Sequence, residues 1–104
     1  MTVRFLAVYD TPADPEAFDR HYDQVHVPLG RQLPRLRRYT IGRNPTAVRG
    51  EAPYHLIAEL EWDSMEDLRA AFASPEGRAT ALDAAHLQEL APVRSMIFQL
   101  DECR

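Results

Sequence analysis

The segment "YHLIAELEW", residues 54–62, is the clearest strand in the chain, and the rest of the fold can be built outward from it. Side chains of a strand point alternately to the two faces of a sheet. One face of this segment is entirely apolar and carries Tyr54, Leu56, Ala58, Leu60 and Trp62. The other face carries His55, Ile57, Glu59 and Glu61. The pattern predicts a strand that packs its apolar face into the core.

Three other segments also have the composition of strands. They are "VRFLAVYD" (residues 3–10), which is rich in β-branched and aromatic residues, "LRRYTIGRN" (residues 36–44) and "VRSMIFQL" (residues 93–100). A loop with proline and glycine separates the second of these from residues 54–62.

Start signals for three helices stand between the strands. Asp14 is a suitable N-cap and Pro15 suits a first helical position, so we expect a helix from there towards Leu29 or Leu33. Asp63 has capping-box spacing to a glutamate three residues later and predicts a second helix. Ser74, followed by a proline, predicts a third.

The resulting order, β-α-β-β-α-α-β, is that of a ferredoxin-like α+β fold with one additional helical segment. It predicts a single domain over residues 1–104, with a four-stranded, mostly antiparallel sheet and helices on one face.

The first and last strands are apolar on both faces, which suggests a second layer beyond the helices. Leu6 and Val8 oppose Phe5 and Tyr9, and the last strand has a similar pattern. Helices can cover only one face of the sheet, and an apolar face left in water is an association site. We therefore expect a homodimer built sheet to sheet.

Composition excludes several classes of protein. The net charge of −4 gives no support for nucleic-acid binding, and no apolar run approaches the roughly 20 residues of a membrane span. Cys103 is the only cysteine, so neither a disulfide framework nor a zinc site of the CxxC type is expected. The N-terminal residues lack the long apolar core of a signal peptide, and a cytoplasmic location is expected.

The segment "HYDQVHVPLG", residues 21–30, places two histidines in the first helix. At about 100° per residue, His21 and His26 flank the apolar stripe of the helix on opposite sides, with Cβ atoms about 10 Å apart. A single metal ion held by these two side chains is therefore not expected. Pro28 cannot donate a backbone hydrogen bond and disfavours the helical region for Val27. The helix should either kink or end just after His26.

His26 has the better neighbours for proton transfer. Tyr22 lies one turn before it, where its hydroxyl could share a substrate, and Asp23 could orient the imidazole. His26 could instead bond a backbone carbonyl at a helix–sheet boundary. We expect His21 to be a partly exposed structural residue and His55 to lie on the sheet face or at an interface, with both as possible supporting residues around the site.

A pocket is expected between the sheet and the first helix, with walls from Tyr9, Phe18 and Trp62. The glutamates Glu59 and Glu61 are expected to pair with arginines of the second strand, Arg38 or Arg43. No phosphate-binding loop, dinucleotide fingerprint or nucleophile elbow is present, so no cofactor is evident.

Two segments resemble the EthD family, named for ethyl tert-butyl ether degradation. They are "FLAVYDTPADPEAFDRHYDQVHVPLGRQLPRLRRY" (residues 5–39) and "EWDSMEDLRAAFASPEGRATALD" (residues 61–83). The most specific element is aromatic-x-x-x-His-x-Pro, formed by Tyr22, His26 and Pro28. The resemblance implies a ferredoxin-like fold that dimerises into an α+β barrel, and a site that contains His26 and Tyr22.

The resemblance also implies a range of activities. EthD-like proteins are described as oxidoreductases of catabolism, and their superfamily contains cofactor-free monooxygenases, isomerases, cyclases, lyases and some haem enzymes. We expect a small dimeric enzyme that acts on a hydrophobic or aromatic molecule, with His26 as the proton-transfer residue. The alternatives are a non-catalytic accessory protein of an oxygenase, a lyase, isomerase or cyclase, and a haem protein with His26 or His55 as the axial ligand.

Overall fold

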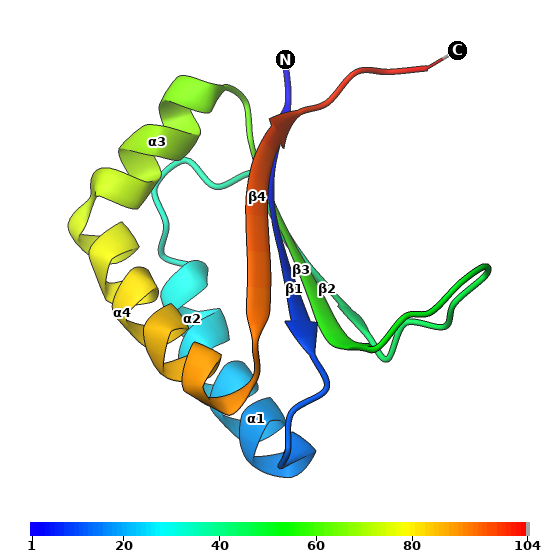
Figure 1. Cartoon of the computed structure of the whole chain (residues 1–104). Helices are drawn as coiled ribbons and strands as arrows, with labels where there is room; N and C mark the ends of the chain where they lie inside the picture. The colour runs from blue at the N-terminus through cyan, green and yellow to red at the C-terminus, as the bar shows by residue number, and fades with distance from the viewer. Residues whose placement is uncertain (104) are drawn as a thin grey trace.

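A computed structural model describes residues 1–103 of the chain. A four-stranded antiparallel sheet carries all of the helices on one face (Figure 1). The elements in chain order are β1 (Val3–Asp10), α1 (Pro15–His21), the π-helical turn η1 (Tyr22–His26), α2 (Val27–Gly30), β2 (Arg38–Arg43), β3 (Tyr54–Trp62), α3 (Met65–Ala73), α4 (Pro75–Leu90) and β4 (Val93–Gln99). The expected ferredoxin-like α+β fold is confirmed.

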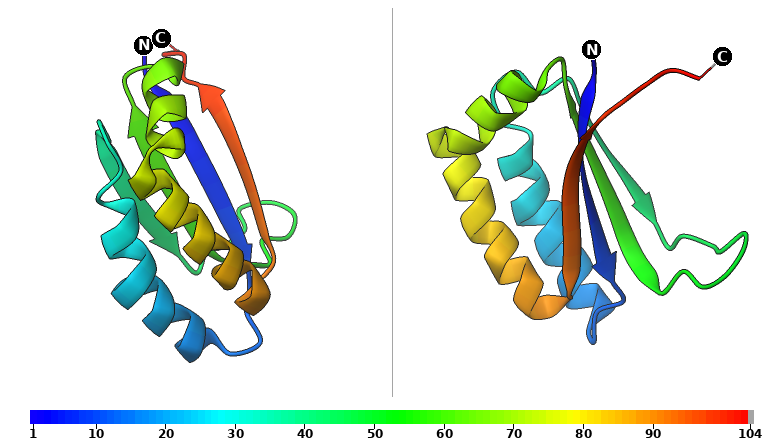
Figure 2. Two further views of the ribbon diagram at one scale, coloured as in Figure 1. Left: turned by 90° about the vertical axis from the view of Figure 1, so that its left-hand side faces the viewer. Right: turned by 45° about the horizontal axis from the view of Figure 1, so that its top comes forward.

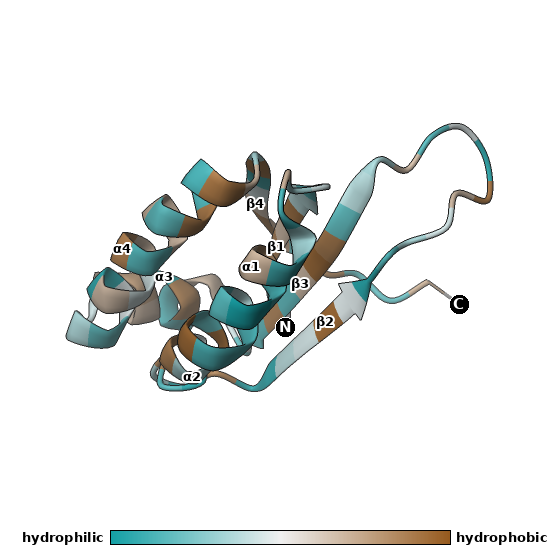
Figure 3. Ribbon diagram, turned by 90° about the horizontal axis from the view of Figure 1, so that it is seen from below, coloured by the Kyte–Doolittle hydropathy of each residue, from teal (hydrophilic) through white to brown (hydrophobic). Residues whose placement is uncertain are grey.

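The sheet has the strand order β2-β3-β1-β4, so β3 lies between β1 and β2. Hydrophobic and hydrophilic residues alternate along β3 when the molecule is seen from below (Figure 3). From Leu56 to Trp62, the predicted apolar face of β3 is buried under the helices. Two helical segments, α1 to α2 and α3 to α4, lie side by side and form one layer on this face (Figure 2).

An irregularity at one end of β3 changes the orientation of His55. Tyr9 pairs with Leu56, whereas Asp10 pairs with Tyr54, so His55 is an extra residue in β3. His55 is buried and its Nε2 lies 2.7 Å from Oδ1 of Asp19 in α1. The prediction that His55 lies on the face opposite the helices is therefore wrong, because the bulge breaks the strict alternation.

Side-chain caps fix the starts of the helices. Asp14 accepts a hydrogen bond from the backbone N–H of Ala17, and Ser74 accepts one from that of Gly77, as predicted from the sequence. The second helix differs, because Ser64 rather than Asp63 is the N-cap of α3. Both residues suit a cap, and the chain begins α3 one residue later than expected.

The sheet face away from the helices carries apolar side chains around a small ionic group. Arg4 contacts Glu59 at 3.4 Å and Glu61 at 2.7 Å. The expected pairs with Arg38 or Arg43 do not form among residues 1–103. Arg4 and Arg38 both lie opposite Glu61 in the strand register, but it is Arg4 that reaches the glutamates, and Arg43 contacts Asp19 and Asp23 instead. The apolar residues of this face are Leu6, Val8, Ile57, Met96 and Phe98. No element of residues 1–103 covers the face in Figures 1 and 2.

No helix within residues 1–103 combines the length and the apolar character that crossing a membrane requires.

Candidate functional site

The helix that begins at Pro15 changes its geometry before Pro28. The backbone N–H of Val27 bonds the carbonyl of Tyr22, five residues back, so η1 is a π-helical turn. Val27 keeps helical dihedral angles (φ −59°, ψ −48°), and α2 continues through Gly30. The expected displacement of Val27 and the expected end of the helix just after His26 are therefore wrong. The irregularity is a π turn that precedes Val27 and contains His26. Pro28 lies in the first turn of α2, where its missing N–H is tolerated.

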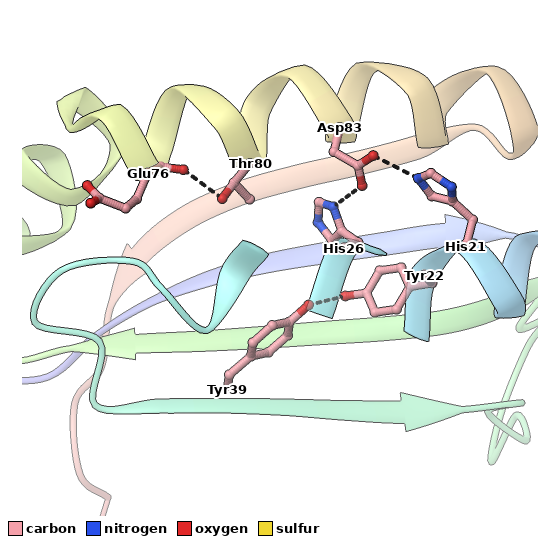
Figure 4. Close-up of polar contacts among 7 residues, drawn as sticks. All are labelled: His21, Tyr22, His26, Tyr39, Glu76, Thr80 and Asp83. Carbon is pink, nitrogen blue, oxygen red and sulfur yellow. Dashed lines mark hydrogen bonds and ion pairs between the residues drawn. The ribbon is translucent and has the colours of Figure 1, made fainter. Parts of the chain in front are cut away.

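The π turn brings His21 and His26 to the same carboxylate. In a regular α-helix these positions are about 140° apart around the axis, whereas the wider π turn brings residues five apart closer to the same side. Nε2 of His21 lies 2.7 Å from Oδ1 of Asp83, and Nδ1 of His26 lies 2.8 Å from Oδ2 (Figure 4). The prediction that the histidines stand apart on opposite sides of the helix is wrong.

Asp83 comes from α4, and the sequence analysis did not identify it. It is the single acidic residue in the alanine-rich segment "RATALDAAH", residues 78–86, and the small neighbours are the only local signal. Asp23, the expected partner of His26, instead contacts Arg43 at 2.6 Å. No group of three or more His, Cys, Asp or Glu side chains within residues 1–103 is arranged to hold a metal ion.

The contacts of His26 fix the tautomer of its ring. Asp83 is an ionised acceptor, so Nδ1 of His26 carries the hydrogen and Nε2 keeps a lone pair. Burial lowers the pKa of His26, and the neighbouring Asp83 opposes this shift only in part. Burial alone would raise the pKa of Asp83, but the hydrogen bonds from His21 and His26 outweigh it and hold that pKa below its ordinary value. At neutral pH the site therefore contains an uncharged imidazole beside a carboxylate.

Two tyrosines form a hydroxyl pair next to His26. The hydroxyl oxygens of Tyr22 and Tyr39 are 2.7 Å apart, and the rings of Tyr22 and His26 have centroids 5.1 Å apart. Burial raises the pKa of Tyr39 to about 12, and it raises that of Tyr22 further. Both hydroxyls therefore keep their hydrogens at neutral pH, and the pair can donate one hydrogen bond beyond itself. The sequence analysis did not single out Tyr39.

An apolar cavity of about 220 Å³ lies between the helices and the sheet. Tyr9, Tyr22, His26 and Tyr39 line its polar part. The remaining walls are apolar and contain many small residues, among them Ala7, Gly30, Ala58, Ala81 and Ala84. The small side chains leave the space that a ligand would occupy.

Phe18 and Trp62, which were expected to line the pocket, lie behind its walls. Phe18 is fully buried and packs against Tyr9 and Tyr22, with ring centroids 5.2 and 5.8 Å away. Trp62 is also fully buried and donates its Nε1–H to the carbonyl of Pro34 at 2.9 Å. These two side chains support the cavity, whereas Tyr9 and Tyr22 face it.

A second hollow of about 290 Å³ lies between α2 and β2. It is larger than the inner cavity but opens widely to the surface, and His26 is not among its lining residues. Its walls are Val27, Arg31, Leu36, Arg37, Arg38, Tyr39 and Ile41. The cavity at His26 is less open and mainly apolar, so it is the better candidate for a reaction.

Substitution of Gly30 tests how closely the hydroxyl pair is packed. A Cβ atom at Gly30 would lie 2.7 Å from Cε2 of Tyr39, so the ring of Tyr39 would have to move. We expect Gly30→Ala to destabilise the fold by about 1–3 kcal/mol in urea unfolding. Gly42→Ala is the control, because its Cβ would meet nothing closer than 4.0 Å. Equal stabilities for the two variants would contradict this packing.

The lowered pKa of His26 predicts that acid destabilises the protein. Below about pH 6.5 the unfolded chain protonates this histidine while the folded chain leaves it neutral, so the unfolded state binds more protons. The free energy of unfolding should fall as the pH decreases from about 7.5 to about 5. Urea titrations of the wild type and of His26→Gln measure the effect, and the variant should lose part of the slope. Equal slopes would contradict a neutral, buried His26.

Comparisons with known proteins agree with this architecture. Residues 10–90 match the family model described as the EthD domain. An uncharacterized 11.0 kDa protein of the thcB-thcC intergenic region of Rhodococcus erythropolis is 40% identical over 83 residues, which are 80% of this chain and 81% of that protein. A crystal structure of an EthD family protein from Bacillus halodurans is 34% identical, with a TM-score of 0.87, and the match covers 97% of this chain and 100% of that one.

A more distant structure shares the fold. SnoaB from Streptomyces nogalater, a cofactor-independent oxygenase, is 17% identical with a TM-score of 0.72, and the match covers 98% of this chain and 95% of SnoaB.

Proposed function

Because the chain belongs to the EthD domain family, we propose that it is an enzyme that takes a proton from a small, mainly apolar molecule bound in the cavity. His26 is the base. The observation that carries the proposal is the uncharged imidazole in an apolar cavity, with Nδ1 bonded to Asp83 and Nε2 without a hydrogen bond among residues 1–103.

The proposed step uses both polar groups of the cavity. Nε2 of His26 accepts a proton from an acidic C–H or O–H group of the ligand. Asp83 stabilises the positive charge that forms on the imidazole. A hydroxyl of the Tyr22–Tyr39 pair donates to the ligand oxygen on which negative charge develops. These interactions are strong because the surrounding walls are apolar.

The cavity also supports a class of ligand. An apolar cavity of about 150 Å³ in another protein holds benzene. The volume of about 220 Å³ in this protein therefore suits one ring with small substituents or a compact bicyclic molecule. A haem, which is far larger than a compact bicyclic molecule, does not fit this volume.

The oxidoreductase activity in catabolism that the family resemblance implies would begin with this deprotonation. Dioxygen is the proposed oxidant of the electron-rich anion, which would need no bound cofactor. The fold shared with SnoaB, a cofactor-independent oxygenase, supports this extension.

Exchange of carbon-bound hydrogen in deuterium oxide tests the proposal without requiring the natural substrate. A panel of small aryl ketones, such as 2-indanone, is incubated with the protein, and NMR follows the incorporation of deuterium. We expect saturable exchange for members that fit the cavity. Binding without exchange across the panel would contradict the enzyme and favour a ligand-binding accessory protein.

The proposed assembly is a homodimer that buries the uncovered sheet face. Leu6 lies beside Met96 on that face, and Met96 is 45% exposed in the isolated chain. Apolar area of this kind is ordinarily covered by association, and a second copy presents the same surface.

Light scattering on the purified protein should give a mass of twice 11.9 kDa. Leu6→Glu should shift the mass to that of the monomer, because it would bury a charge in each half of the interface. Leu82→Glu adds the same charge on α4, where the side chain is 76% exposed, and should leave the dimer intact. A monomeric wild type would overturn the proposed assembly.

A further inference from the structure

The carboxylate of Asp83 is shared by two histidines from consecutive helical segments. Nε2 of His21, at the end of α1, is hydrogen-bonded to Oδ1, and Nδ1 of His26, at the end of η1, is hydrogen-bonded to Oδ2 (Figure 4). The side chain of Asp83 is 11% exposed, and no lysine or arginine forms an ion pair with it within residues 1–103. One negative charge is therefore available to two imidazoles.

We propose that His21 is a positioning residue for His26, which holds the Asp83 carboxylate in place and competes with His26 for its negative charge. The consequence for catalysis rests on the proposed function, whereas the pairing itself belongs to the protein without ligand.

The positioning effect follows from the geometry. The Nε2–H of His21 donates to Oδ1 of Asp83 at 2.7 Å, and this bond fixes the plane of the carboxylate so that Oδ2 faces Nδ1 of His26. Without this donor, Asp83 can rotate about its side-chain bonds towards the surface. The preferred tautomer of His26 would then lose its fixed acceptor.

The competition follows from exposure. The side chain of His21 is 23% exposed, whereas that of His26 is 9% exposed, so water stabilises a positive charge better at His21. A charged His21 neutralises Asp83 and repels a second positive charge on His26. Acid therefore reduces the capacity of His26 to accept a proton from a ligand.

The titratable groups around His21 leave this competition in place. His86 of α4 has its ring centroid 4.7 Å from that of His21 and contacts Glu89 at 3.9 Å. Tyr22 is the first residue of η1, and its ring packs against that of Tyr9 of β1. Burial raises the pKa of both tyrosines, so they stay uncharged over the range in which histidines titrate.

Histidine titration of the intact protein, followed by NMR of the ring nuclei without ligand, is the first arm of the test. In the wild type, the signals of His26 should shift in two steps, one of which coincides with the titration of His21. In His21→Gln, whose amide keeps a donor but no charge, a single step should remain, with its midpoint raised by about one pH unit. A single step for His26 that is identical in both proteins would overturn the inference.

Deuterium exchange of 2-indanone is the second arm and separates the two proposals. His21→Gln should retain exchange, but the acidic side of its pH–rate profile should move to higher pH. His21→Leu removes the hydrogen-bond donor and should lower the maximal rate about tenfold, with little change in ligand affinity. His55→Gln, whose ring contacts Asp19 rather than Asp83 in the wild type, is the control and should keep the wild-type profile. Exchange by the wild type with an unchanged profile in His21→Gln would overturn the role of His21 alone. No exchange by the wild type would overturn the proposed function, and the titration would still decide whether the histidines compete.

Discussion

His26→Gln should lower the rate of deuterium exchange into bound 2-indanone by about 100- to 10,000-fold, the usual contribution of a positioned base. Glutamine is of similar size and can keep a hydrogen bond to Asp83 through its amide group, but it cannot accept a proton near neutral pH. The other residues of the cavity wall are unchanged, so ligand affinity should change little. The loss should therefore appear in the maximal rate.

The control for His26→Gln is His55→Gln. His55 is also buried and bonded to an aspartate, Asp19, but it does not line the cavity. It should keep wild-type exchange even if its stability decreases. Circular dichroism of both variants reports whether they are folded. Persistent exchange in a folded His26→Gln protein would exclude His26 as the base.

Asp83→Asn should reduce exchange by about 100-fold or more, although the substitution changes only one atom of the side chain. An amide offers one oxygen acceptor and one NH₂ donor, so it cannot accept hydrogen bonds from both His21 and His26. If the amide donates to Nδ1 of His26, the ring hydrogen moves to Nε2, which then cannot accept a proton from the ligand. If it donates to His21, the carboxylate charge that stabilises a protonated His26 is still lost.

Asp23→Asn is the matched control for this change. Asp23 is the carboxylate that sequence spacing alone connects with His26, but in the structure it pairs with Arg43 at an exposed position. Because an exposed pair of this kind contributes little to stability, we expect nearly wild-type stability and exchange. Equal losses in the two variants would contradict the assignment of Asp83, and an inactive Asp23→Asn with an active Asp83→Asn would restore the sequence-based choice.

The fold could be predicted because its signals are local. Alternation over residues 54–62 identifies the buried face of β3, and the caps at Asp14 and Ser74 locate the starts of α1 and α4. The bulge that turns His55 towards α1 depends on how β1 and β3 pair, and periodicity within one strand does not contain that information.

The candidate site could be predicted only in part. His26 and Tyr22 stand in one short segment, which the EthD-like pattern around Pro28 marks. Their partners Asp83 and Tyr39 arrive from α4 and β2, which are distant in sequence. Angular positions calculated at 100° per residue are also wrong across the π turn. One wider turn is sufficient to bring His21 and His26 to the same side of the helix.

The tautomer of His26 tests most directly whether Asp83 prepares this histidine as a base that faces the cavity. Long-range ¹H–¹⁵N NMR spectra of the uniformly labelled, ligand-free protein at neutral pH distinguish the two ring nitrogens. We expect a neutral ring with hydrogen on Nδ1 and a lone pair on Nε2, and we expect Asp83→Asn to remove this preference. A wild-type ring with hydrogen on Nε2, or one that is fully charged at neutral pH, would contradict this role of Asp83.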